Sequence, residues 1–163
     1  MKVNLGSGLM LLNGWINADR RVHKTKDGKV TDVIFDAPGL PFKSNSCTKV
    51  ACIHMIEHLT YDDALVLLRE VRRVLAPGGV AIFEAPDIRK ALLCAKSDRQ
   101  LAEFLFGALN ELRKDLPEYG HRWGWTQEAL VSEARAAGLK VLHVGDGTTH
   151  LRPERDFRVE VRV

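Results

Sequence analysis

Apolar, strand-like runs alternate with helix-like runs along this sequence, and five of the strand-like runs end in glycine or ionisable residues. Alternation of this kind is typical of an α/β sheet. Open α/β sheets bind ligands beyond the carboxyl ends of their strands. Packing alone does not readily explain polar residues at all of these positions. We therefore expect a ligand site at one edge of a sheet, built from Gly6-Ser7-Gly8, Asp19, Asp36, His54 and Asp87.

Hydrophobic periodicity places the individual elements. Apolar residues at helical spacing predict helices at Tyr61–Leu75, Ile88–Lys96, Asp98–Lys114 and Thr126–Ala137. We expect Thr60 and Thr126 to cap the first and last of these helices, and Pro77-Gly78-Gly79 to end the first. Strands are expected at Lys2–Leu5, Trp15–Ala18, Val30–Phe35, Lys49–Ile53, Gly79–Ala85, Leu139–Val144 and Phe157–Val163.

The composition is that of an ordinary globular domain. The chain has 163 residues, of which 45% are hydrophobic and 28% charged, and this predicts a single domain over residues 1–163. The net charge is +3 with Lys and Arg interspersed among acids, which argues against a nucleic-acid partner. The three cysteines form no CxxC pair, which favours a cytoplasmic location. No apolar run reaches the roughly 20 residues of a membrane helix.

An ordered series of motifs carries more information than any one of them. The motifs are Asn4-Leu5-Gly6-Ser7-Gly8, Asn13-Gly14-Trp15-Ile16-Asn17-Ala18-Asp19, Phe35-Asp36, Leu40-Pro41-Phe42, His54-Met55-Ile56-Glu57-His58-Leu59, Val74-Leu75-Ala76-Pro77-Gly78-Gly79 and Ala85-Pro86-Asp87. This series resembles the class I, Rossmann-like methyltransferases that use S-adenosylmethionine, and in particular a subfamily of small predicted methyltransferases. The likeness is strong over about residues 2–87 and continues weakly to the end of the chain.

The resemblance implies a doubly wound α/β fold whose mostly parallel sheet has the strand order 3-2-1-4-5-7-6 and an antiparallel last strand. It also implies S-adenosylmethionine as the cofactor and methyl transfer as the reaction. The residues that the resemblance assigns to cofactor binding are Leu5, Gly6, Ser7, Gly8, Asp19, Arg20, Asp36, Ala37, His54 and Met55.

These residue types suit such a cofactor. Gly6 and Gly8 would let the backbone approach the amino-acid end of the cofactor, where a Cβ would collide. The Ser7 hydroxyl could donate to the cofactor carboxylate. The Asp19 carboxylate can accept two hydroxyl donors and would hold the ribose. Asp36 would accept from the adenine amino group.

The chain departs from most enzymes of this class in two places. Only Leu9–Asn13 separates Gly8 from Gly14, which is too short for a full first helix. Loop amides would therefore bind the cofactor carboxylate. The sequence also starts almost within its first strand, so residues 88–125 are the candidate substrate lid. We expect a shallow, open substrate site or one that a second subunit completes, as in a homodimer.

A sulfonium methyl donor is already activated, so the protein mainly has to align the acceptor and exclude water. A base is needed only for an acceptor whose proton has a high pKa, and His54 and His121 are the candidates. Analogy with the subfamily suggests a small-molecule or glycan-precursor acceptor. The cluster from His121 to Trp125 could bind that acceptor or could pack the insert on the sheet.

Three other readings compete with the enzyme. The domain could be an inactive methyltransferase-like partner subunit, which the missing N-terminal cover favours. A dinucleotide dehydrogenase would need a third glycine where Leu11 stands. A zinc hydrolase could use His54, Glu57 and His58, because H-x-x-E-H is a zinc-peptidase pattern, but that pattern must lie within a helix. We therefore predict no metal site.

Overall fold

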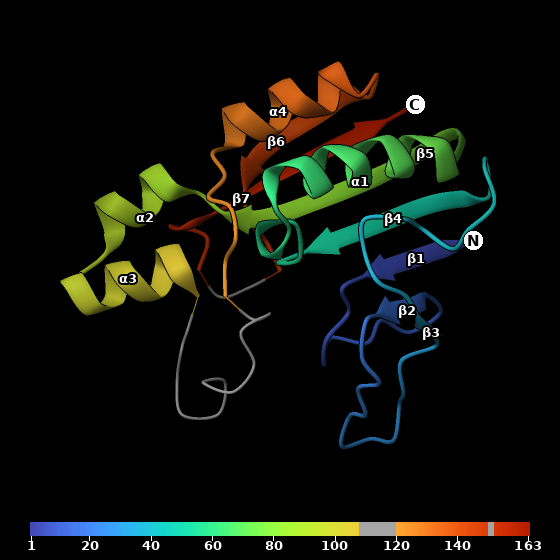
Figure 1. The fold of residues 1–163 in the computed structure, drawn as a ribbon, viewed down its shortest axis with the longest axis horizontal. Helices are drawn as coiled ribbons and strands as arrows, with labels where there is room; N and C mark the ends of the chain where they lie inside the picture. Colours follow the sequence, from blue (N-terminus) through green and yellow to red (C-terminus); the bar gives the residue numbers. More distant parts are fainter. Residues whose placement is uncertain (108–119, 150–151) are drawn as a thin grey trace.

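The computed structural model describes residues 1–107, 120–149 and 152–163. The strands in these residues form one sheet. Within these residues the sheet has seven strands in the order β3-β2-β1-β4-β5-β7-β6 (Figure 1). Strand β7 is antiparallel to both neighbours and the other pairs are parallel. The predicted order is thus confirmed. The strands are β1 (Lys2–Leu5), β2 (Ile16–Asp19), β3 (Val33–Ile34), β4 (Cys47–Ile53), β5 (Leu75–Pro86), β6 (Lys140–Asp146) and β7 (Asp156–Arg162).

The helices begin where the sequence predicts them. Thr60 caps the first long helix by accepting the N–H of Asp63 at 3.2 Å, and Thr126 caps the last by accepting the N–H of Ala129 at 3.1 Å. The part of the predicted helix Asp98–Lys114 that follows residue 107 lies outside the described residues. The helices are η1 (Ile56–His58), α1 (Tyr61–Val74), α2 (Ile88–Cys94), α3 (Asp98–Phe106) and α4 (Gln127–Ala136).

Strands β3 and β5 differ most from their predicted lengths. Strand β3 is shorter than the apolar run Val30–Phe35, because Val30 forms an antiparallel bridge with Lys24 and so belongs to a local turn. Strand β5 is longer than predicted and starts at Leu75, directly after α1, so Pro77-Gly78-Gly79 lies inside the strand. The loop after β1 contains no helix, as the short spacing between Gly8 and Gly14 indicates.

The core forms where α1 and α4 lie side by side over the sheet (Figure 1). Leu67, Leu68 and Val71 of α1 are fully buried in one cluster with Phe83 of β5 and Phe157 of β7. Burying side chains of this size stabilises the fold by about 1.5–3 kcal/mol each. This packing fixes the strands rigidly, so the loops at their carboxyl ends start from fixed positions.

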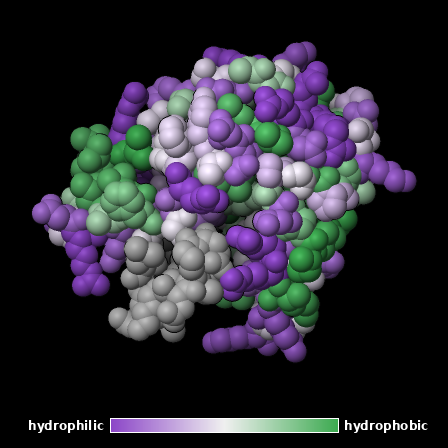
Figure 2. Space-filling model, viewed as in Figure 1, coloured by the Kyte–Doolittle hydropathy of each residue, from purple (hydrophilic) through white to green (hydrophobic). Residues whose placement is uncertain are grey.

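Strands β1, β4 and β5 end at the same side of the sheet, and α2 and α3 flank that side (Figure 1). Figure 2 shows an apolar patch over α2, where Leu92 and Leu93 are 59% and 87% exposed. Among the described helices, none combines the length and the apolarity that a membrane crossing requires.

Candidate active site

The loop after β1 turns sharply at two glycines. Gly6 and Gly8 have φ values of +60° and +49°, which L side chains rarely adopt. A Cβ at Gly6 would lie 2.4 Å from Cγ of Met55, so this glycine makes room for a protein side chain. A Cβ at Gly8 would meet no atom within 4 Å. The loop is therefore closed by Met55 on one side and open at Gly8, where we expected a ligand.

Asp19 at the end of β2 holds this loop in place. Its Oδ2 accepts the N–H of Gly8 at 2.8 Å, and its Oδ1 accepts the N–H of Arg21 at 3.1 Å. The Nε2 of His23 lies 3.3 Å from the same Oδ1. The side chain is only 12% exposed. Sequence reasoning assigned Asp19 to a ligand, whereas here it also organises the glycine loop.

The ends of β2 and β3 are tied together beside Asp19. The N–H of Phe35 donates to the Asp19 carbonyl at 3.0 Å, which places Asp36 next to the end of β2. Asp36 is exposed, and its Oδ2 lies 3.6 Å from Nη2 of Arg20. Ala37 follows as a half-buried residue. Three strand ends thus bring the glycine loop and the two predicted carboxylates to one edge.

His54 at the end of β4 is held by two carboxylates. Its φ is +50°, and its Nδ1 and Nε2 each lie 3.0 Å from a carboxylate oxygen, of Glu57 and Asp156 respectively. Burial lowers the pKa of His54, but these two carboxylates outweigh burial and raise the pKa to about 9. The ring is therefore protonated near neutral pH and donates both N–H groups. This geometry does not suit the proton-accepting role that the sequence suggested.

The Asp87 carboxylate follows the end of β5, and its hydrogen bonds are made within the chain. Its Oδ1 accepts the N–H groups of Arg89 and Lys90 at the start of α2. Its Oδ2 accepts the N–H of Gln127 at the start of α4, at 2.9 Å. Asp87 therefore caps one helix and ties a second helix to it.

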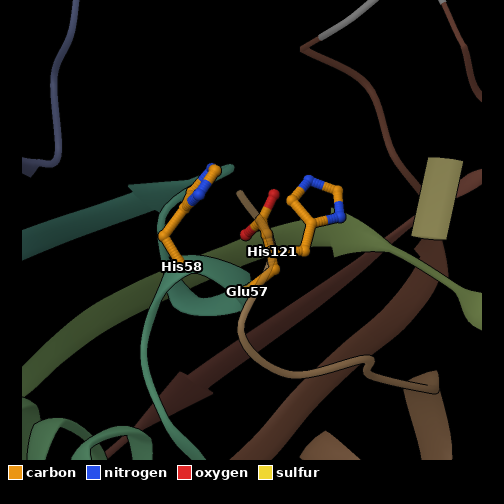
Figure 3. Close-up of side chains that lie close together, drawn as sticks. All are labelled: Glu57, His58 and His121. Carbon is orange, nitrogen blue, oxygen red and sulfur yellow. The ribbon is translucent and has the colours of Figure 1, made fainter. Parts of the chain in front are cut away.

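Glu57, His58 and His121 lie close together (Figure 3), and Glu57 also contacts His54. Glu57 and His58 belong to η1, and His121 comes from the segment that precedes α4. One potential ligand atom from each lies within 4.8 Å of the others. Burial lowers the pKa of His121 below its usual value of 6.5, so the neutral ring predominates near neutral pH. Because His54 precedes η1 and points to Asp156, the helical zinc-peptidase arrangement of His54, Glu57 and His58 is wrong.

The aromatic residues after His121 pack the insert on the fold. The Trp125 side chain is almost fully buried. Tyr61 of α1 lies 4.9 Å from the Trp123 ring and 6.1 Å from the Trp125 ring, centroid to centroid. Trp123 is 43% exposed. The sequence allows this cluster either to bind the acceptor or to pack the insert on the sheet. Trp125 packs the insert, and Trp123 keeps an exposed face toward solvent.

The glycine loop can be tested for a fit to an adenosyl cofactor with a carboxylate and hydroxyl groups. The Ser7 hydroxyl is buried and has no hydrogen-bond partner among the described residues. Such a group is costly unless a ligand or water satisfies it. Asp19 accepts two backbone N–H groups and lies 3.3 Å from His23 Nε2, and a carboxylate offers about four acceptor positions. Gly8 borders open space. These features fit the cofactor.

The comparison with known proteins supports a methyltransferase. Residues 14–83, from just before β2 into β5, match the sequence profile of the methyltransferase domain family. The chain has the class I methyltransferase fold. The cofactor of this class is S-adenosylmethionine, and the site for it in such folds lies beyond the strand ends described above. No curated protein sequence matches the chain.

Solved structures share the fold of this chain at low sequence identity. A protein of Pyrococcus horikoshii is 18% identical with a TM-score of 0.66, and 98% of this chain aligns with 80% of that one. An S-adenosylmethionine-dependent methyltransferase of Mesorhizobium loti is 16% identical with a TM-score of 0.63, and the coverages are 99% and 89%. The CcbJ methyltransferase of Streptomyces caelestis is 14% identical with a TM-score of 0.66, and the coverages are 99% and 82%.

Proposed function

We propose that this protein is a methyltransferase that transfers the methyl group of S-adenosylmethionine to a nucleophile on a small molecule or a glycan precursor. The observation that carries the proposal is the convergence of the glycine loop and Asp19, which the hydrogen bond from Gly8 to Asp19 fixes at 2.8 Å. The link between the ends of β2 and β3 adds Asp36 to the same edge. A site prepared in this way needs little rearrangement when the cofactor binds.

Each residue of this edge has a proposed role. The Ser7 hydroxyl donates to the cofactor carboxylate, together with loop amides, because no first helix supplies them. Asp19 accepts the ribose hydroxyls through its remaining acceptor capacity. Asp36 and the backbone of Ala37 contact the adenine, and Arg20 keeps Asp36 oriented across 3.6 Å. The fully buried Leu5 and the half-buried Gly6 and Met55 form the wall of the site.

The bound cofactor supplies an electrophilic methyl group on a positively charged sulfur. The chain's own task is to align the acceptor in line with that group and to exclude water. His121 is the better of the two histidine candidates for accepting a proton, because burial keeps its ring neutral. His54 instead acts as a positioning residue that holds Glu57 and Asp156 together.

The proposed acceptor class rests on analogy with the subfamily. Leu92 and Leu93 give α2 an exposed apolar face beside the strand ends. We propose residues 88–125 as the cover over the acceptor, with residues 108–119 lying outside the described part. A second copy of the chain could complete this cover, and sedimentation of the purified protein tests that dimer.

Calorimetric titration with S-adenosylmethionine tests the cofactor site. We expect Asp19→Asn to weaken binding by about 10- to 100-fold, since hydrogen bonds to a charged group contribute about 1.5–3 kcal/mol. Asp36→Asn should have a smaller effect, because Asp36 is exposed to solvent. Asp27→Asn is the matched control, because Asp27 is a similarly exposed carboxylate in a separate turn. Circular dichroism confirms that each variant is folded.

A transfer assay with methyl-labelled cofactor tests the acceptor class. Small-molecule and glycan-precursor mixtures are compared with RNA and with protein, and we expect the label in the first group. Label that appears only in RNA or protein contradicts the acceptor class. Cofactor binding without transfer to any acceptor favours the inactive partner subunit. Absence of cofactor binding overturns the proposed function as a whole.

A further inference from the structure

We propose that Glu57, His58 and His121 bind a divalent zinc ion. These three side chains come from two segments that are far apart in the sequence, and they converge beside the strand ends (Figure 3). Their ligand atoms lie within 4.8 Å of one another. Two histidines and one glutamate form a recurring set of protein ligands for catalytic zinc. The proposal does not depend on methyl transfer.

Glu57 provides the strongest indication of a missing partner. The side chain is 2% exposed, and its Oε1 lies 3.0 Å from Nδ1 of His54. Its Oε2 is buried and has no hydrogen-bond partner among the described residues. A buried carboxylate oxygen without a partner is costly, and an ion is one of the ordinary explanations for such a group. The carboxylate that carries this unsatisfied oxygen belongs to the same cluster as the two histidines.

His58 is oriented as metal-binding histidines usually are. Its Nδ1 lies 3.1 Å from the carbonyl oxygen of Gly120. Because a carbonyl oxygen only accepts, Nδ1 carries the hydrogen, and Nε2 of the neutral ring keeps its lone pair. Histidine ligands commonly donate their second ring N–H to a backbone carbonyl, which fixes both the tautomer and the ring orientation. His54 performs the corresponding task for Glu57.

The backbone holds His121 close to the other two residues. The N–H groups of Arg122 and Trp123 both donate to the carbonyl of Glu57, at 2.8 and 3.2 Å. The rings of His58 and His121 stand edge to face with centroids 5.2 Å apart. Tetrahedral zinc with bonds of about 2.0–2.2 Å needs ligand atoms about 3.5 Å apart. Zinc binding at these residues therefore requires small side-chain rotations that bring the ligand atoms closer together than in the present structure.

The ligands of the proposed zinc ion differ from those of the zinc hydrolase considered above. His54 is not a ligand, because both of its ring nitrogens face carboxylates. Three protein ligands leave at least one position of a tetrahedral zinc ion for water or another ligand, as in catalytic rather than structural zinc sites. The His121 nitrogen cannot bind zinc and accept a proton at once. With zinc bound, His121 is therefore a ligand.

Zinc binding is measured on the purified full chain after removal of metals with a chelator and without S-adenosylmethionine. We expect one equivalent of Zn²⁺ to bind in calorimetry and to raise the melting temperature. His58→Ala and His121→Ala should each weaken Zn²⁺ binding at least about tenfold, on the scale of known effects around metal sites. His143→Ala is the control, because His143 is exposed on β6.

Cobalt substitution provides a second measurement that needs no variant. Co²⁺ in a site of two nitrogens and one carboxylate should give the intense visible absorption of a four- or five-coordinate ion without a thiolate charge-transfer band. Saturable binding that both histidine variants leave unchanged overturns the proposal. So does a thiolate band, or the absence of binding at about 100 μM Zn²⁺. Asp19→Asn should retain Zn²⁺ binding, so this test and the cofactor test fail independently.

Discussion

The protonated ring of His54 should make the stability of this protein depend on pH above neutrality. The fold raises the pKa of His54 from its ordinary value of 6.5 to about 9. A raised pKa in the folded state stabilises the protein fully below pH 6.5, and this contribution is lost as the pH rises through about 9. The difference between the two values corresponds to at most about 3 kcal/mol, since a tenfold change in proton affinity is 1.36 kcal/mol.

The perturbation that tests this account is His54→Asn. Asparagine tolerates the left-handed backbone at φ +50° better than most residues, so the substitution removes the ring charge without adding much strain. Glu57 and Asp156 then lose the partner that holds their own pKa values below the usual range against the effect of burial. We expect the variant to be less stable than the wild type at neutral pH.

Urea unfolding followed by tryptophan fluorescence gives the free energy of unfolding between about pH 6 and pH 10. A chelator is present throughout, so that bound metal does not contribute. The wild type should lose up to about 3 kcal/mol over this range, and His54→Asn should lose much less. His143→Asn, at an exposed site on β6, should behave like the wild type. Equal slopes for the wild type and His54→Asn would refute the reasoning.

Two other predictions concern the glycine loop and a buried ion pair. Gly6→Ala should impair cofactor binding and folding, because its Cβ would lie 2.4 Å from Met55 Cγ; adding Met55→Ala should restore part of the loss, as seen in cofactor titration and thermal melting. Glu84 is fully buried and pairs with Arg158 at 2.7 Å, so Arg158→Met should cost about 3–5 kcal/mol in urea unfolding. Burial raises the pKa of Glu84, but Arg158 and the two threonines beside it have the larger effect and hold the pKa below its usual value of 4.5. The stabilisation from this pair is therefore complete above about pH 4.5 and decreases as the pH falls below it.

Local sequence patterns were sufficient for most of the fold. The cap at Thr60 and the stripe of buried residues in α1 are local signals, and both predicted the helix closely. The ends of β3 depend on a partner elsewhere in the chain. The N–H of Thr31 donates to the carbonyl of His23, which directs the start of the apolar run into a turn. Hydrophobicity alone does not reveal that contact.

The candidate site was only partly visible in the sequence. Asp19 and the glycine loop could be placed because both follow strands directly. The environment of His54 could not, because its partner Asp156 lies 102 residues away. The cluster with His121 has a weak sequence signal, an H-x-x-E-H pattern followed by a later histidine before two tryptophans. Only the fold shows that His121, and not His54, joins Glu57 and His58.

The central claim is that the glycine loop and the two carboxylates bind one S-adenosylmethionine molecule. A crystal structure with the demethylated product of the cofactor tests this most directly. We predict the ribose hydroxyls within hydrogen-bond distance of the Asp19 carboxylate, at about 2.5–3.0 Å, and the adenine beside Asp36. An adenosyl group bound elsewhere, or an Asp19 carboxylate that makes no contact with the ribose, would contradict the account.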